Sequence, residues 1–134
     1  MRRVGLLRAV EAALQLTRAT LELRLLPSSR TSTLLGAVQH GTHEQDVPRD
    51  ETREAELVGL AVAGAARRLP WHPTCLRQAL AAQRMLRRRG IASRLHLGVT
   101  GATATEAHAW VTVAGRPVVG GHGLERYVPL AAFR

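Results

Sequence analysis

Apolar residues recur with a helical period in three stretches of the first ninety residues. In residues 4–26 an apolar side chain stands near every third or fourth position, and Pro27 ends the stretch. We expect this stripe to face the core, with a partner protein or a membrane surface as the alternatives. Its members are Leu6, Val10, Ala13, Leu14, Thr17, Leu21 and Leu25. Residues 48–69 predict a second helix, with acids in the first turn and arginines in the last, as the helix dipole favours.

The third helical stretch runs from Cys75 to about Arg89. Prolines at 70 and 73 break the chain before it, Thr74 is well placed as its N-cap, and Gly90 is a typical C-terminal stop. One face of this predicted helix is apolar apart from a glutamine. That face consists of Leu76, Ala79, Leu80, Gln83 and Leu86.

After the third helix the apolar period changes to two, which is typical of β-strands. Residues 94–99 predict a first strand and residues 107–113 a second. A tight turn at 114–116 leads into a third strand from 117–119, antiparallel to the second, and residues 127–130 predict a short final strand. Helices followed by a meander of strands indicate an α+β domain, with the N-terminal helices packed on a small antiparallel sheet.

A length of 134 residues suits one domain, which we place over residues 1–134. Within it we expect an N-terminal helix (1–26), a polar loop (27–50) and a core that carries the chemistry (70–130). The loop contains residue types that bind zinc, but their spacing matches no metal motif, so we expect no metal. These residues are His40, His43, Glu44 and Asp46.

The charge is strongly positive: 19 basic residues, all of them arginine, against 10 acidic ones give a net charge of +9. Such a surface attracts nucleic acids, but it attracts acidic proteins and peptides as well. Aromatic residues make up only 3% and are scattered, so we expect no nucleic-acid partner. Arg77, Arg84 and Arg88 on the third helix are the candidate surface for an acidic peptide or partner, and a solvated helix face is the alternative.

The single cysteine excludes a disulfide within the chain and indicates a reducing compartment. The basic and apolar start is similar to a signal peptide, but Arg8, Glu11 and Arg18 interrupt its apolar part. The longest apolar run, 57–66, is well short of the roughly 20 residues that span a bilayer. We therefore expect a soluble, cytoplasmic protein without a transmembrane segment.

Cys75 is the candidate nucleophile, because free N–H groups and the dipole at a helix start stabilise a thiolate. His108, between two alanines on the predicted second strand, is the candidate general base. A thiol at a helix start facing a histidine on a strand is the arrangement of cysteine-protease catalysis. The alternatives are a small buried hydrophobe for Cys75 and a hydrogen-bonded sheet residue for His108.

Two segments together resemble the leader peptidases of lasso-peptide biosynthesis, which belong to the transglutaminase-like, papain-related superfamily. They are CLRQALAAQRMLRRRGIASRLHLGV (Cys75 to Val99) and HAWVTVAGRPVVG (His108 to Gly120). The shared pattern is Cys-Leu-x-Arg, an apolar helix, arginines before Gly-Ile, a strand ending in Gly-Val, then His-Ala-Trp-Val and a glycine turn. The chain has about the size of the stand-alone peptidase half of that system.

This resemblance implies a transglutaminase-like or papain-like core and a cysteine peptidase that removes the leader from a ribosomally made lasso precursor peptide before macrocyclisation, without a cofactor. It implies three partners: the leader-bearing precursor peptide, a RiPP recognition element protein and an asparagine-synthetase-like lasso cyclase. Cys75 carries over as nucleophile and His108 as base, and Trp110 is expected to form a wall of the site.

One position departs from the family pattern. The family usually has an aspartate that orients the histidine, and the matching residue here is Gly120. Glu125, Glu106, a backbone carbonyl or no group at all could take that role, since a Cys–His pair can act without it. Two other functions stay open: another Cys–His acyl-transfer enzyme on the same core, such as an amidase or transglutaminase, and a non-catalytic arginine-rich binding module.

Overall fold

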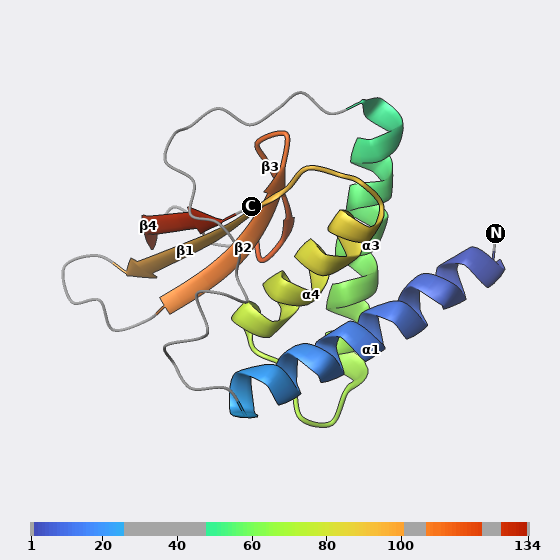
Figure 1. The fold of residues 1–134 in the computed structure, drawn as a ribbon, viewed down its shortest axis with the longest axis horizontal. Helices are drawn as coiled ribbons and strands as arrows, with labels where there is room; N and C mark the ends of the chain where they lie inside the picture. Colours follow the sequence, from blue (N-terminus) through green and yellow to red (C-terminus); the bar gives the residue numbers. More distant parts are fainter. Residues whose placement is uncertain (1, 26–47, 101–106, 122–126, 134) are drawn as a thin grey trace.

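The computed structural model of the protein describes residues 2–25, 48–100, 107–121 and 127–133 (Figure 1). Within these ranges the chain first forms helices and then strands. The helices are α1 (Arg2–Leu25), α3 (Arg49–Arg68) and α4 (Cys75–Arg88). The strands are β1 (Arg94–Thr100), β2 (Ala107–Val113), β3 (Arg116–Val119) and β4 (Tyr127–Phe133). The predicted helices and strands are thus confirmed, and the predicted loop over residues 27–50 lies almost entirely outside the described residues.

The strands form one antiparallel sheet in the order β3-β2-β1-β4. The predicted meander is therefore correct for β1, β2 and β3 only. The last strand is longer than predicted and pairs with β1 at the far edge of the sheet instead of with β3. Figure 1 shows the β3 edge nearest to α3 and β4 at the opposite edge. A strand can pair with any open edge, and the period-two pattern does not say which one it takes.

The turn between β2 and β3 forms as predicted. Ala114 and Gly115 have φ angles of 50° and 78°, and two positive φ values in succession are the signature of the hairpin turn whose twist matches the strands. The turn places Val113 opposite Arg116, and an irregularity between Thr112 and Val111 then shifts the register by one residue, so that Val111 lies opposite Val119. The hairpin therefore carries Gly120 back toward the start of β2.

The helices stand in two layers on one face of the sheet, which confirms the predicted α+β class. Helix α4 packs on β2 and β1, helix α3 packs on β3, and α1 crosses both helices on the side away from the sheet (Figure 1). Helix α3 lies very close to β3. Gly59 permits this approach, because a Cβ at that position would stand 2.0 Å from the carbonyl oxygen of Val118. The core between these layers is made of alanine, valine and leucine side chains with Met85 and Ile91.

The prediction of which face of α1 packs inward was wrong. The members of the expected stripe that are at least half exposed are Leu6, Val10, Leu14, Leu21 and Leu25. The buried residues are Ala12, Leu16, Ala19 and Thr20. Helix α1 is apolar on two sides, and the side with alanines lets it approach α3 and α4 more closely. That side also carries charged residues that find partners on the other two helices.

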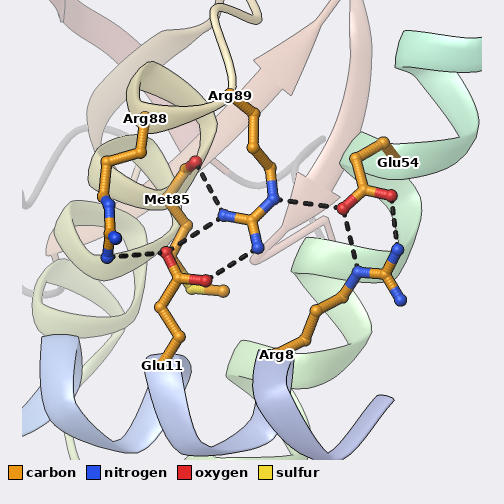
Figure 2. Close-up of polar contacts among 6 residues, drawn as sticks. All are labelled: Arg8, Glu11, Glu54, Met85, Arg88 and Arg89. Carbon is orange, nitrogen blue, oxygen red and sulfur yellow. Dashed lines mark hydrogen bonds and ion pairs between the residues drawn. The ribbon is translucent and has the colours of Figure 1, made fainter. Parts of the chain in front are cut away.

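Arg89, the C-cap residue that follows α4, joins all three helices through ion pairs (Figure 2). Its guanidinium donates to Glu11 of α1 at 2.7 and 3.1 Å and to Glu54 of α3 at 3.1 Å. Arg8 of α1 donates to the same Glu54 at 2.5 and 2.9 Å. These hydrogen bonds from Arg8 and Arg89 lower the pKa of Glu54 although its partial burial acts to raise it.

Candidate functional site

Cys75 is the first residue of α4, as predicted, and its side chain is half-buried against the core. Thr74 occupies the N-cap position with an extended backbone, but its side chain makes no capping hydrogen bond. The start of α4 is fixed instead by Gln78. Its side-chain amide donates to the carbonyl of Pro73 at 2.9 Å, and its backbone N–H donates to the carbonyl of Thr74 at 3.0 Å. The thiol therefore stands in a first helical turn, where free N–H groups stabilise a thiolate.

His108 lies on β2 with its ring half-buried, and its Nε2 is 2.7 Å from the carbonyl oxygen of Gly120. A carbonyl oxygen only accepts hydrogen bonds, so Nε2 must carry the proton and donate it. In the neutral ring this leaves Nδ1 unprotonated, with a lone pair that can accept a proton. His108 is thus held in the tautomer that a general base needs at Nδ1.

Gly120 can make this contact because it has no side chain. Its φ is +73°, in the left-handed region, and a Cβ there would stand 2.7 Å from the carbonyl oxygen of Ala109 and 3.3 Å from Nε2 of His108. At the position where the resembling family has an aspartate, a backbone carbonyl is therefore the group that bonds the imidazole. Glu106 and Glu125, the other residues considered for this role, lie outside the described residues.

Aromatic rings line the sheet around His108. Trp110 is buried and stacks beside His108 with ring centres 5.9 Å apart, and Tyr127 of β4 stacks at 4.8 Å. His96 of β1 stacks on Trp110 at 5.2 Å and has Nε2 within 2.7 Å of the Thr112 hydroxyl. The sequence did not point to His96 or Tyr127, because their proximity to the site follows from strand pairing, which no local pattern reveals.

The candidate nucleophile and base are not joined directly. Side chains alternate along β2, so His108 lies on the face of the sheet opposite Ala109 and Val111, which pack into the core with α4. Between Cys75 and His108, both of them described, there is no hydrogen bond. The structure thus brings His108 together with Gly120, Trp110 and Tyr127, and it places Cys75 on the helix that covers the other face.

The three arginines proposed for an acidic partner differ in their surroundings. Arg84 is bonded to Glu22 of α1 and its side chain is only 14% exposed, so it joins two helices. Arg88 pairs with Glu11 at 3.1 Å but remains 64% exposed. Arg77 is half-buried and forms no ion pair with the residues that the structure describes. The α4 surface therefore offers fewer free cations than the sequence suggests.

Among the described residues no cluster of three or more histidine, cysteine or acidic side chains could hold a metal ion. The loop residues His40, His43, Glu44 and Asp46 fall outside these ranges. In the described part of the chain no helix combines the length and the hydrophobicity that crossing a bilayer requires.

Comparison with known protein families adds one finding. Residues 7–132, nearly the whole chain, match the family described as the transglutaminase-like superfamily. Searches of curated proteins and of solved structures found no match. The matched span contains Cys75, His108 and Gly120, so the residues of the candidate site all lie inside it.

Proposed function

The chain belongs to the transglutaminase-like superfamily, and from that premise we propose that it is a cysteine peptidase that removes the leader from a lasso precursor peptide before macrocyclisation. The superfamily provides a cysteine-based core for proteolysis or acyl transfer. The observation that carries the proposal is the hydrogen bond from His108 Nε2 to Gly120, which leaves Nδ1 free in the same core that has the chain's single cysteine at a helix start.

Cys75 would act as the nucleophile. Its sulfur stands where the partial positive charge of the α4 N-terminus stabilises the thiolate. Attack on the scissile carbonyl forms a bond from sulfur to carbon and places negative charge on the carbonyl oxygen. The backbone N–H of Cys75, in the first turn of α4, is the natural donor to that oxyanion.

His108 would move the protons. Nδ1 takes the proton of the thiol and gives it to the amine that leaves as the peptide bond breaks, which frees the amino terminus of the core peptide. Water then attacks the thioester, its proton passes to Nδ1 and on to sulfur, and the leader leaves as a carboxylic acid. Before substrate binds, the Gly120 carbonyl holds Nε2–H and orients the ring. Since His108 and α4 lie on opposite faces of the sheet, the cycle requires a rearrangement at the start of β2 or of α4 that brings Nδ1 within hydrogen-bond reach of the sulfur when substrate is bound.

The partners in this proposal come from the family resemblance. A recognition element protein binds the leader and presents the precursor, and a separate cyclase closes the ring on the freed amino terminus. A lone, unpaired thiol in the nucleophile position suits a reducing compartment, which supports a cytoplasmic location.

A binding module is the second candidate, and a specific observation favours it: Cys75 and His108, both among the described residues, share no hydrogen bond. In that case the chain would hold a partner without cutting it. The two functions differ in what the loss of the thiol does, because a binding module does not need Cys75.

The test is mass spectrometry of a candidate precursor incubated with the protein and its recognition partner. Cleavage at one bond is expected, and Cys75→Ala and His108→Ala should each abolish it. His72→Ala is the matched control, because His72 is exposed and lies outside the strand, and it should cleave normally. Cleavage that survives in Cys75→Ala would overturn the assignment of the nucleophile, and a folded wild type that binds without cutting would favour the binding module.

A further inference from the structure

A groove of about 880 Å³ lies between the first half of α3 and the β2–β3 turn. Three arginines line it from two separate elements: Arg49 and Arg53 from α3, and Arg116 from β3. The other lining residues are Thr52, Glu56, Leu57, Leu60 and Ala114. The turn is at the end of β2 opposite His108, so the groove is separate from the candidate catalytic site.

The three arginines of this groove are exposed, and in the described part of the chain none of them forms an ion pair or a side-chain hydrogen bond. Other arginines of the chain are bound to glutamates of the helices, namely Arg8, Arg18, Arg84, Arg88 and Arg89. With three arginines and one glutamate, the lining keeps two positive charges unbalanced. Unpaired guanidinium groups that converge from two elements are suited to bidentate contacts with carboxylates.

The groove also has an apolar part. Leu57 lies one helical turn after Arg53, and Leu60 is 70% exposed, so both offer aliphatic surface between the arginines. A ligand that covers Leu60 gains hydrophobic burial, while its carboxylates reach the arginines on either side. Among the described residues no aromatic side chain lines the groove, so its lining lacks the stacking platform that single-stranded nucleic acids use.

We propose that this groove binds an acidic linear peptide segment of a separate polypeptide, with carboxylates on both sides of a leucine-sized residue. A second copy of this chain is a poor occupant, because its own net charge of +9 repels the groove. Binding at the groove does not require Cys75 to act as a nucleophile, so a binding measurement alone tests it.

The experiment measures fluorescence anisotropy of a labelled synthetic peptide of alternating glutamate and leucine with the full-length protein. The test variant is Arg53→Gln with Arg116→Gln. The control is Arg67→Gln with Arg68→Gln, which removes the same charge from exposed positions at the other end of α3. Hydrogen bonds to charged groups are the strong ones, so the test variant should bind about tenfold weaker or worse, and the control should bind within about twofold of wild type.

A peptide with glutamine in place of glutamate should lose binding to the wild-type protein, which keeps the test independent of any variant's folding. Leu60→Ser should weaken binding of the acidic peptide several-fold. Equal weakening in the groove and control variants, or no binding by wild type, would overturn the proposal. So would tighter binding of a single-stranded oligonucleotide of equal charge.

Discussion

Nε2 of His108 donates a hydrogen bond to the carbonyl oxygen of Gly120 over 2.7 Å, at the position where the resembling family places an aspartate side chain. A carbonyl and a carboxylate both hold the Nε2–H and leave Nδ1 free. They differ in charge, because a neutral carbonyl stabilises the imidazolium less than an anion does. The orientation of His108, the proposed base, can therefore persist in a chain whose two aspartates both lie far upstream.

The tautomer of His108 is the first prediction. In the neutral ring, ¹⁵N NMR of the histidine side chains should show His108 protonated at Nε2 and unprotonated at Nδ1, because only a donor can bond the Gly120 carbonyl. His72, which is exposed, should show no such locked preference and serves as the internal reference. A His108 ring protonated at Nδ1 would contradict the proposed role of the Gly120 carbonyl.

A methyl group at position 120 should lower the stability of the fold and displace the ring of His108, the proposed base. Gly120→Ala combines an alanine at φ +73° with a Cβ 2.7 Å from the Ala109 carbonyl oxygen, so we expect a loss of about 2–5 kcal/mol in unfolding free energy. Gly115→Ala is the matched control, because Gly115 has φ +78° but a Cβ added there would have nothing within 4 Å. It should cost only about 1–2 kcal/mol.

Urea titrations measure the unfolding free energy of both variants. The rate of peptide cleavage, at a temperature where each variant is folded, reports whether His108 still acts as the proposed base. Gly115→Ala should keep its cleavage rate, whereas Gly120→Ala should lose it as the His108 ring is displaced. Equal stability losses in the two glycine variants would show that the close packing at Gly120 is not as described.

Local sequence signals predicted most of the helices and strands, whereas contacts between residues far apart in the sequence were not predicted. Prolines before Cys75, the glycine after α4 and the Ala-Gly turn act on their own neighbours, so the bounds of α4 and the β2–β3 hairpin followed from the sequence. The pairing of β4 with β1, and with it the position of Tyr127 beside His108, depends on residues about thirty positions apart. No periodicity encodes such a contact.

The buried face of α1 was predicted wrongly for a different reason. Hydrophobicity ranked the stripe that includes Leu14 and Leu21 above the side with Ala12 and Ala19, yet the alanine side is buried. In the orientation that forms, Arg8 of α1 bonds Glu54 of α3, a contact that cannot be predicted without knowing which helices pack together.

Removing the central arginine of the helix network should destabilise the fold. Arg89→Ala leaves Glu11 with only Arg88 and Glu54 with only Arg8 among the described residues, and the Arg89 side chain is 22% exposed. We expect a loss of about 1–3 kcal/mol in unfolding free energy. Arg88→Ala is the control, since Arg88 bonds the same Glu11 but is 64% exposed, and it should cost about 0.5 kcal/mol or less. Similar losses in both variants would contradict the bridging role of Arg89.

Acid should weaken the same network. Hydrogen bonds from Arg8 and Arg89 hold the pKa of Glu54 below its ordinary value, and for Glu22 burial acts to raise the pKa but the hydrogen bonds from Arg84 and Arg18 outweigh it. A carboxyl whose pKa is lower in the folded state contributes stability above its unfolded pKa of about 4.3, and the contribution is lost as pH falls through the lower folded value.

Unfolding free energy from urea titrations should therefore be nearly flat from about pH 6 down to 5 and fall below about pH 4. Glu54→Gln cannot ionise, so it should be less stable than wild type at neutral pH and should show a shallower fall in acid. Glu51→Gln, on the same helix and without an ion pair in the described part of the chain, should follow the wild-type profile. A Glu54→Gln profile parallel to wild type would show that the pairing of Glu54 with Arg8 and Arg89 contributes nothing to acid stability.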